Sequence, residues 1–136
     1  DRSSMTNRIW RVLDNPHTTI LGHPTGRLLL SRDGYELEME RILEKAAEKE
    51  VVIEINANPH RLDLDWRWCK KVREMGIRLI INPDAHSVAE ISNTGFGTAV
   101  ARKGWCERKD ILNCLDTAGM KEFLRKRKLD YNRKIL

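Results

Sequence analysis

Short apolar runs alternate along the chain with longer segments in which apolar side chains recur at helical spacing. A short continuous apolar run is typical of a strand buried in a parallel sheet, and a spacing of three to four residues is typical of an amphipathic helix. The apolar runs predict strands at residues 18–21, 51–58 and 76–81. The periodic segments predict helices at residues 3–13, 35–49 and 66–75. This alternation predicts the α/β class, with parallel strands joined by helical crossovers.

The predicted helices carry further signals of where they pack and end. Helix 35–49 has its apolar positions on one face, which predicts that this face packs on the core. Asp65 is placed to cap the start of helix 66–75, and Gly76 is placed to end it in the left-handed conformation. Later segments predict a short turn or helix at 89–94, a flexible joint at 95–97 and a basic helix at 119–129. A length of 136 residues sets the limit at one domain.

Polar side chains follow each predicted strand at the point where it ends. His23 follows the first strand, and Asp84 and His86 follow the third. The end of the second strand carries Asn56, Asn58, His60 and Arg61. Because the carboxyl ends of parallel strands lie on one side of a sheet, we expect these side chains to line one rim.

Asp84 and His86 carry the clearest chemical signal at this rim. Two residues apart on an extended segment, their side chains point to the same side, so one metal site could receive both. A glycine and a proline flank His23 and hold it on bent, non-helical backbone, which presents its imidazole. The alternative for Asp84 and His86 is an Asp that caps a turn beside a packed His. Glu54, inside the second strand, either ligates a metal or holds a neighbouring Arg or His.

The net charge of +5 is concentrated at the end of the chain. Residues 121–136 carry seven Lys and Arg against two acidic side chains, an excess equal to the net charge of the whole chain. The preceding 120 residues are therefore balanced. A cluster of this kind can bind a phosphate backbone by releasing counterions, or it can be the solvated end of a helix.

The absence of membrane signals and the cysteine spacing bear on the compartment. No apolar run approaches the roughly 20 residues of a membrane span, and no apolar signal segment opens the chain, so we expect a cytoplasmic location and no membrane partner. Cys69, Cys106 and Cys114 form no C-x-x-C pair, which predicts reduced thiols rather than disulfides or a thiolate zinc site. Cys69 falls on the inward stripe of its helix and is expected to be a small core residue.

Four segments carry a resemblance to a known family. They read GHPTGRLL at 22–29, EINANPHRLDLDWRW at 54–68, NPDAHS at 82–87 and ARKGW at 101–105. Together they resemble the polymerase and histidinol phosphatase (PHP) domain. Among its branches they look most like the C-terminal domain of bacterial and archaeal family X DNA polymerases. The likeness covers residues 5–128, and the long middle segment is its most specific part.

The resemblance implies a fold and an activity. The fold is a distorted (β/α)₇ barrel with a multinuclear Mn²⁺ or Zn²⁺ site at the strand ends. The activity is a 3′–5′ exonuclease that hydrolyses phosphoester bonds at single-stranded DNA 3′ ends in DNA repair. The implied catalytic residues and metal ligands are His23, Asp84 and His86. The candidates for binding substrate are Arg61, Arg27 and Asn58, with a structural salt bridge as the alternative for each arginine.

The chain departs from the family pattern at its start. The family site also uses an N-terminal H-x-H motif, a further Asp or His, an early Glu and a His before the segment that opens this chain, and none is present. With a first residue other than Met, this predicts a partial PHP domain at 1–128 and a basic tail at 129–136, downstream of a polymerase domain. Half a ligand set binds metal weakly and an open barrel leaves strand edges unpaired. The isolated chain is therefore expected to be inactive and marginally stable.

Two other functions remain open. One is a stand-alone phosphatase of small phosphomonoesters, like the histidinol-phosphate branch of the same superfamily. A preference for small monoesters over DNA 3′ ends would distinguish it. The other is a non-catalytic module that positions a polymerase or binds DNA through the basic tail, which the salt dependence of DNA binding would reveal.

Overall fold

Three parallel strands form the centre of the molecule. The structure is a computed structural model that describes residues 1–135, with the side chains of residues 1–127. The strands are β1 (Ile20–Leu21), β2 (Val52–Asn56) and β3 (Leu79–Asn82), in the order β1-β2-β3. The register places Ile53 of β2 beside Leu21 on one side and Leu79 on the other. The predicted α/β class with parallel strands is confirmed.

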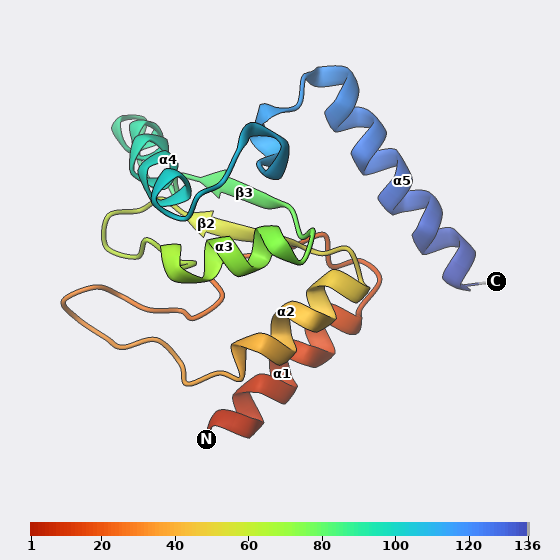
Figure 1. The fold of residues 1–136 in the computed structure, drawn as a ribbon, viewed down its shortest axis with the longest axis horizontal. Helices are drawn as coiled ribbons and strands as arrows, with labels where there is room; N and C mark the ends of the chain where they lie inside the picture. The colour runs from red at the N-terminus through yellow and green to blue at the C-terminus, as the bar shows by residue number, and fades with distance from the viewer. Residues whose placement is uncertain (136) are drawn as a thin grey trace.

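Five α-helices flank this sheet within residues 1–135 (Figure 1). They are α1 (Arg2–Asp14), α2 (Met39–Glu48), α3 (Trp66–Glu74), α4 (Thr94–Lys103) and α5 (Thr117–Ile135). Three short 3₁₀ turns are η1 (Ala89–Asn93), η2 (Arg108–Asp110) and η3 (Leu112–Cys114). Helix α1 packs along α2, and α4 packs on β2 and β3. No helix in the described part of the chain has the length and apolar character to cross a membrane.

The core lies between β2 and the helices beside it. Every residue of β2 is buried, and Ile42, Leu43 and Val72 join the same fully buried cluster. Burying an aliphatic side chain contributes about 1.5–3 kcal/mol, before the conformational entropy lost on folding is subtracted. The apolar face predicted for the second helix is confirmed, and Cys69 lies in this core as expected. This cluster fixes the strand order that brings the polar strand ends together.

The ends of α3 follow the predicted caps. The side chain of Asp65 accepts a hydrogen bond from the amide of Arg67. Gly76, just past the helix, has a φ of 72°, in the left-handed region that glycine tolerates without strain. Both capping predictions are confirmed, so the sequence correctly placed α3 between β2 and β3.

The predicted start of the second helix is wrong. Periodicity extended this helix over 35–49, whereas it begins at Met39. Tyr35 is held out of the helix because its amide donates to the carbonyl of Thr25 at 2.8 Å and its ring packs directly on Gly26. Tertiary contacts to the loop after β1 therefore outweigh the local helical pattern.

The flexible joint predicted at 95–97 is also wrong, because these residues lie inside α4. A Cβ atom at Gly97 would lie 2.5 Å from Cγ2 of Ile81 and 2.8 Å from Cβ of Ala57. The glycine therefore lets α4 approach β3 and the end of β2 closely. Sequence alone did not separate this packing role from flexibility.

The outer edge of β3 is occupied within the described chain. The side-chain amide of Asn113 accepts from the Ile81 amide at 2.8 Å and donates to the Ile81 carbonyl at 2.9 Å. A β-bridge joins Leu79 to Ile111 beside it. Asn113 thus supplies the two hydrogen bonds that another strand would otherwise make here.

Helix α5 contacts the rest of the molecule at a few described points and extends beyond the helix predicted at 119–129 (Figure 1). The Arg127 guanidinium donates to three backbone carbonyls, those of Thr18, Lys49 and Glu50. The guanidinium of Arg78 lies 6.0 Å from the ring centroid of Phe123. The backbone of the predicted tail, 129–136, continues this helix as far as Ile135, and its side chains lie outside the described residues.

Candidate active site

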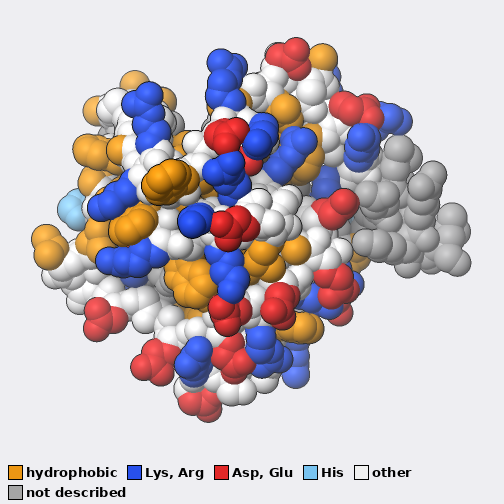
Figure 2. Space-filling view, in the orientation of Figure 1, with side chains coloured by type: hydrophobic (Ala, Val, Ile, Leu, Met, Phe, Trp, Pro, Cys, Tyr) orange, Lys and Arg blue, Asp and Glu red, His pale blue; other side chains and the backbone are white. Residues whose placement is uncertain are grey.

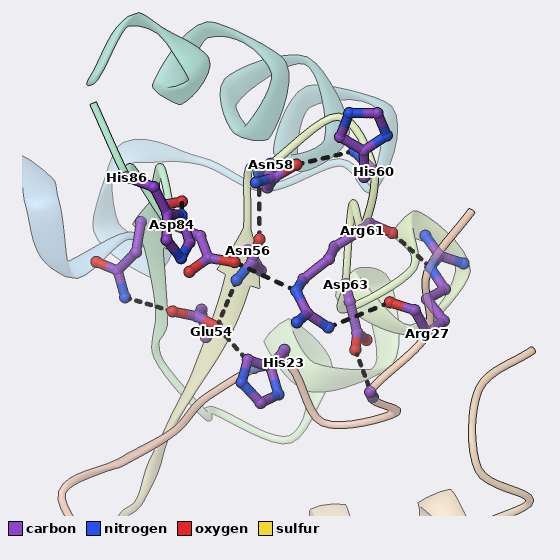
Figure 3. Close-up of polar contacts among 12 residues, drawn as sticks. His23, Arg27, Glu54, Asn56, Asn58, His60, Arg61, Asp63, Asp84 and His86 are labelled. Atoms are coloured by element: carbon purple, nitrogen blue, oxygen red, sulfur yellow. Dashed lines mark hydrogen bonds and ion pairs between the residues drawn. The ribbon is translucent and has the colours of Figure 1, made fainter. Parts of the chain in front are cut away.

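The carboxyl ends of the strands form one polar rim (Figure 3). His23 follows β1, and Asp84 and His86 follow β3. Asn58 and Arg61 lie in the loop that follows β2, between these two ends. The parallel strand order therefore brings the candidate residues to one side of the sheet, and their chemical roles stay predictions.

Glu54 connects the three strands at the rim. This residue is buried on β2. Its Oε2 accepts a hydrogen bond from the backbone amide of His23 at 2.6 Å, and its Oε1 accepts from Nδ2 of Asn82 at 2.7 Å. Nδ2 of Asn56 adds a longer contact of 3.4 Å to Oε2. Of the two interpretations left open by the sequence, this arrangement favours a carboxylate that holds its neighbours, because both oxygens are already engaged.

Two of the candidate ligands lie on unusual backbone. His23 has a φ of 29° and Asp84 a φ of 52°, values that residues with a Cβ rarely adopt. Such conformations are maintained only when surrounding contacts determine them, and they concentrate at functional sites. The bent backbone predicted at His23 from its flanking glycine and proline is therefore present. At Asp84 the backbone leaves the extended conformation from which Asp84 and His86 were predicted to point to the same side.

Asp63 holds the loop after β1 in place through its side-chain carboxylate. Its side chain is fully buried, and Oδ2 accepts from the amides of Thr25 and Gly26 at 3.0 Å each. Burial raises the pKa of this carboxyl above its ordinary value, although hydrogen bonds from Thr25 and the nearby Arg27 oppose the shift. Within residues 1–127, Oδ1 has no hydrogen-bond partner. The loop that presents His23 thus depends on a buried acidic group that is costly to ionise.

Arg27 is bound to the neighbouring loop rather than open to the rim. Its Nε donates to the carbonyl of Arg61 at 2.7 Å, and its Nη1 pairs with Oδ2 of Asp65 at 3.0 Å. Its Nη2 donates to the carbonyl of Leu62. All three nitrogens of the guanidinium are therefore engaged, which favours the structural salt bridge that the sequence left open as the alternative to phosphate binding.

Arg61 faces the rim directly. Its Nε lies 3.2 Å from Oδ2 of Asp84, and the two side chains are 22% and 29% exposed. Its Nη1 donates to the carbonyl of Arg27 at 3.3 Å, which orients the guanidinium. A partly exposed arginine held in this way can bind a phosphate oxygen, but only by sharing or releasing Asp84.

His86 is largely open to solvent. Its side chain is 76% exposed. Nδ1 lies 2.9 Å from the carbonyl oxygen of Asp84, and the backbone amide donates to Glu90 at 2.8 Å. Nε2 is therefore the ring nitrogen left to meet a ligand. Contacts with Asp84 and Glu90 fix the base of the side chain but bury little of the ring.

Asn58 serves the turn after β2. Its amide donates to Oδ1 of Asn56 at 3.1 Å, and its own Oδ1 accepts from the amide of His60 at 3.0 Å. This chain of side-chain-to-backbone bonds is typical of consecutive Asx turns. Asn58 therefore helps to present Arg61, and its predicted role in binding substrate stays a prediction.

The rim does not fit a complete metal site by itself. In the part of the chain that the structure describes, no group of three or more His, Cys, Asp or Glu side chains is spaced to hold a metal ion. Asp84 is paired with Arg61, and both oxygens of Glu54 are engaged. Protein metal sites of this kind need at least three protein ligands. The predicted ligation by His23, Asp84 and His86 stays a prediction.

Sequence reasoning missed Asp63. The signal was present as an acidic residue between two leucines in the long middle segment, since Leu62 and Leu64 flank it. This pattern predicts a structured position, but it does not tell which of Asp63 and Asp65 turns inward. The structure decides this, because Asp65 caps α3 and pairs with Arg27 while Asp63 is fully buried.

Comparisons with known proteins give relatives of two kinds. No protein-family model matches the chain. The chain is 40% identical over 119 residues to the DNA polymerase/3′-5′ exonuclease PolX of Bacillus subtilis (strain 168), a match that covers 88% of this chain and 21% of the relative. It is 26% identical over 129 residues to a probable phosphatase of Thermoanaerobacter sp. (strain X514), which covers 90% of this chain and 50% of the relative. A probable phosphatase of Clostridium novyi (strain NT) is 31% identical over 98 residues, 65% of this chain and 36% of the relative.

These matches test the predicted resemblance and show how much of each relative the chain covers. The chain spans about a fifth of the PolX and half of the Thermoanaerobacter phosphatase. The PolX match covers most of this chain at an identity well above that of the Thermoanaerobacter phosphatase. The resemblance to the family X DNA polymerases is thereby confirmed.

Proposed function

We propose that this chain is part of a phosphoesterase, the PHP-type 3′–5′ exonuclease of a family X DNA polymerase that processes DNA 3′ ends in repair. One observation carries the proposal. The parallel strand order gathers Asp84, His86, His23 and Arg61 at one rim, and that rim belongs to a chain whose relatives include a named exonuclease and probable phosphatases. Both names denote hydrolysis of phosphoester bonds, which is the chemistry that such a rim can serve.

The barrel expected for this family is part of the same proposal. Among the described residues, β1 pairs with β2 alone, whereas the outer edge of β3 is met by Asn113 and Ile111. We therefore assign the next strand of a (β/α)₇ barrel to the free edge of β1. Partnering that edge would also cover Ile20, which is exposed here.

The side chains of the rim have distinct proposed roles. Arg61 binds a phosphate oxygen of the substrate with its planar fork, releasing Asp84 as it does so. Asp84, His86 and His23 contribute to a Mn²⁺ or Zn²⁺ site whose other ligands come from outside residues 1–127. Asp63 and Glu54 keep the loop of His23 in place before any ligand binds.

An assay with two substrates tests the proposal. The full polypeptide encoded by the gene is incubated with 5′-labelled single-stranded DNA or with a small phosphomonoester, with and without Mn²⁺. We expect shortening of the DNA from its 3′ end, lost in His86→Ala and kept in His17→Ala, whose histidine lies outside the rim. If the DNA stays intact while the monoester is hydrolysed, the protein is a small-molecule phosphatase and not an exonuclease.

The 136-residue chain by itself gives the second arm of this test. Because its described residues form no complete ligand group, we expect no measurable nuclease activity from it with Mn²⁺. Mn²⁺-dependent cleavage by this chain, abolished in His86→Ala, would contradict the proposal that further metal ligands come from outside residues 1–127. It would show that the rim alone is sufficient for catalysis.

A phosphatase of small monoesters is the second candidate. The observation that favours it is coverage, because the chain matches half of the Thermoanaerobacter phosphatase but only a fifth of the PolX. A non-catalytic DNA-binding role for α5 has less support. Two of its four described basic side chains are already engaged, Arg125 with Glu122 and Arg127 with backbone carbonyls. The test is to delete residues 121–136 and measure how the DNA-binding constant depends on salt concentration. An unchanged dependence would exclude that role.

A further inference from the structure

Two cysteine side chains lie close together on the side of α3 that faces the core. Cys69 of α3 is fully buried, and Cys106, in the turn after α4, is partly buried against the same core. The two side chains lie near enough to interact, while the Cys69 thiol donates to the carbonyl of Asp65 at 3.6 Å and the Cys106 thiol to that of Gly104 at 3.8 Å. Their sequence separation hides this contact, because neither residue belongs to a C-x-x-C pair.

Gly104 makes the contact between the thiols possible. A Cβ atom at this position would lie 2.4 Å from Cβ and 3.3 Å from Sγ of Cys69. Sγ of Cys106 lies 3.8 Å from the carbonyl oxygen of the same glycine. Both sulfurs therefore lie against Gly104, and any larger residue there would force the turn away from α3.

Arg73 keeps the turn in this position. Its Nη1 donates to the carbonyl of Trp105 at 2.8 Å, and its Nε lies 3.2 Å from Oδ2 of Asp110. It also forms an ion pair with Glu107. One arginine of α3 thus contacts three residues around Cys106 and holds the turn that carries this cysteine against α3.

The environment makes the two thiols unequal. Cys106 lines a groove of about 290 Å³ that also includes the exposed Cys114, so a small oxidant can reach its sulfur. Interaction with the Cys69 thiol lowers the pKa of the Cys106 thiol, and the charge of Arg73 acts in the same direction, against burial and the charge of Asp110. The same contact and burial raise the pKa of the Cys69 thiol. Cys106 is therefore the accessible nucleophile and Cys69 the shielded partner.

We propose that Cys106 and Cys69 form a peroxide-reactive modification site that closes to a disulfide. The Cys106 thiolate attacks one oxygen of hydrogen peroxide, so that an S–O bond forms, the O–O bond breaks and hydroxide leaves. The sulfur is oxidised by two electrons to a sulfenic acid. Cys69 then loses its proton as its sulfur attacks the Cys106 sulfur, and the S–O bond breaks to release water. Two thiols and one peroxide give one disulfide and two waters.

Peptide mapping of the 136-residue chain tests this site without any reference to its enzymatic activity. The reduced chain is treated with hydrogen peroxide, alkylated in denaturant and cut with trypsin, which separates the three cysteines into different peptides. We expect the peptides of residues 68–70 and 104–108 to appear joined, less two hydrogen atoms. Cys106 should lose its free thiol on the order of tenfold faster than Cys114.

Three matched variants and one condition control the result. Cys114→Ser should leave the joined peptides unchanged. Cys69→Ser should leave Cys106 without a partner and take it to the sulfinic acid. Cys106→Ser should protect Cys69 from oxidation. Joining of Cys114 in place of Cys69, joining between chains only, or equal pairing in folded and urea-unfolded chain would each overturn the proposal.

Discussion

The two ends of the rim are built in opposite ways. At the His23 end, the loop after β1 is held by the buried carboxylates of Glu54 and Asp63 and by the engaged guanidinium of Arg27. At the other end, His86 is mostly exposed and Asp84 has Arg61 as its salt-bridge partner in the described chain. At one end buried groups hold the loop beneath His23, although His23 itself is exposed, whereas at the other end His86 is presented to solvent with little support from the fold.

This difference separates preorganisation from ligand contact. Hydrogen bonds to buried carboxylates hold a loop in shape before any ligand arrives, because the interior strengthens each bond and makes its loss costly. An exposed histidine gains little from the fold and is free to form a new contact. The comparison therefore predicts that substitutions at the His23 end change stability most, while those at the His86 end change function most.

The largest effect is expected for Asp63→Ala. The substitution leaves the amides of Thr25 and Gly26 without their buried acceptor, which we expect to cost about 2 kcal/mol of unfolding free energy, part of the loss being offset by removal of a buried charge. Urea unfolding followed by circular dichroism measures it. The matched control is Asp33→Ala, an exposed acid in the same half of the chain, which should stay within about 0.5 kcal/mol. Equal effects of the two substitutions would contradict the role of Asp63.

The next largest effect on stability is expected for Arg27→Lys. Lysine keeps the charge opposite Asp65 but cannot reach the carbonyls of Arg61 and Leu62 at the same time, so we expect a loss of about 1 kcal/mol. Urea unfolding gives the value, and Arg67→Lys, at a side chain that is 72% exposed, is the control. If Arg27→Lys matches the control in stability yet weakens phosphate binding, Arg27 acts on substrate and not on the loop.

At the His23 end, Asp63 and Asp65 are expected to change the stability with pH in opposite directions. Burial raises the pKa of Asp63, so the folded chain keeps a proton that the unfolded chain has lost, and this group adds stability as the pH falls through its folded pKa. For Asp65, burial alone would raise the pKa, but the amide of Arg67 and the guanidinium of Arg27 lower it overall. Its contribution is present above its unfolded pKa and is lost as the pH falls through its folded pKa.

Carbon-13 NMR titration of the two carboxyl groups measures these directions. The resonance of Asp63 should titrate above the ordinary aspartate range and that of Asp65 below it. In Asp63→Asn the gain in stability on acidification should shrink, since the titrating group is gone. Two carboxyls that titrate together would show that burial does not distinguish them.

His86→Ala should have the smallest effect on stability. With little of its ring buried, we expect a change below about 0.5 kcal/mol in urea unfolding. The same substitution in the full polypeptide should lower exonuclease activity by about a hundredfold or more. A large loss of stability would show that the Asp84–Glu90 turn depends on this side chain, and the contrast between the two ends of the rim would disappear.

Much of the fold follows from local pattern. The apolar runs located three parallel strands, and Asp65 and Gly76 located the ends of α3, because these signals depend on residues close in sequence. The predicted start of α2 and the joint at 95–97 are wrong for the opposite reason. Both depend on distant partners, since Tyr35 is held by the loop after β1 and Gly97 is packed on β3.

The sequence by itself determined the α/β class, the candidate residues at the strand ends and the resemblance to family X polymerases. Tertiary structure alone decided which polar side chains face inward and which stay available. It buried Asp63, engaged Arg27, left His86 exposed and placed the sulfurs of Cys69 and Cys106 against Gly104. The physical reason is that a local pattern records which residues are polar, whereas burial and hydrogen-bond partners arise only when distant segments pack together.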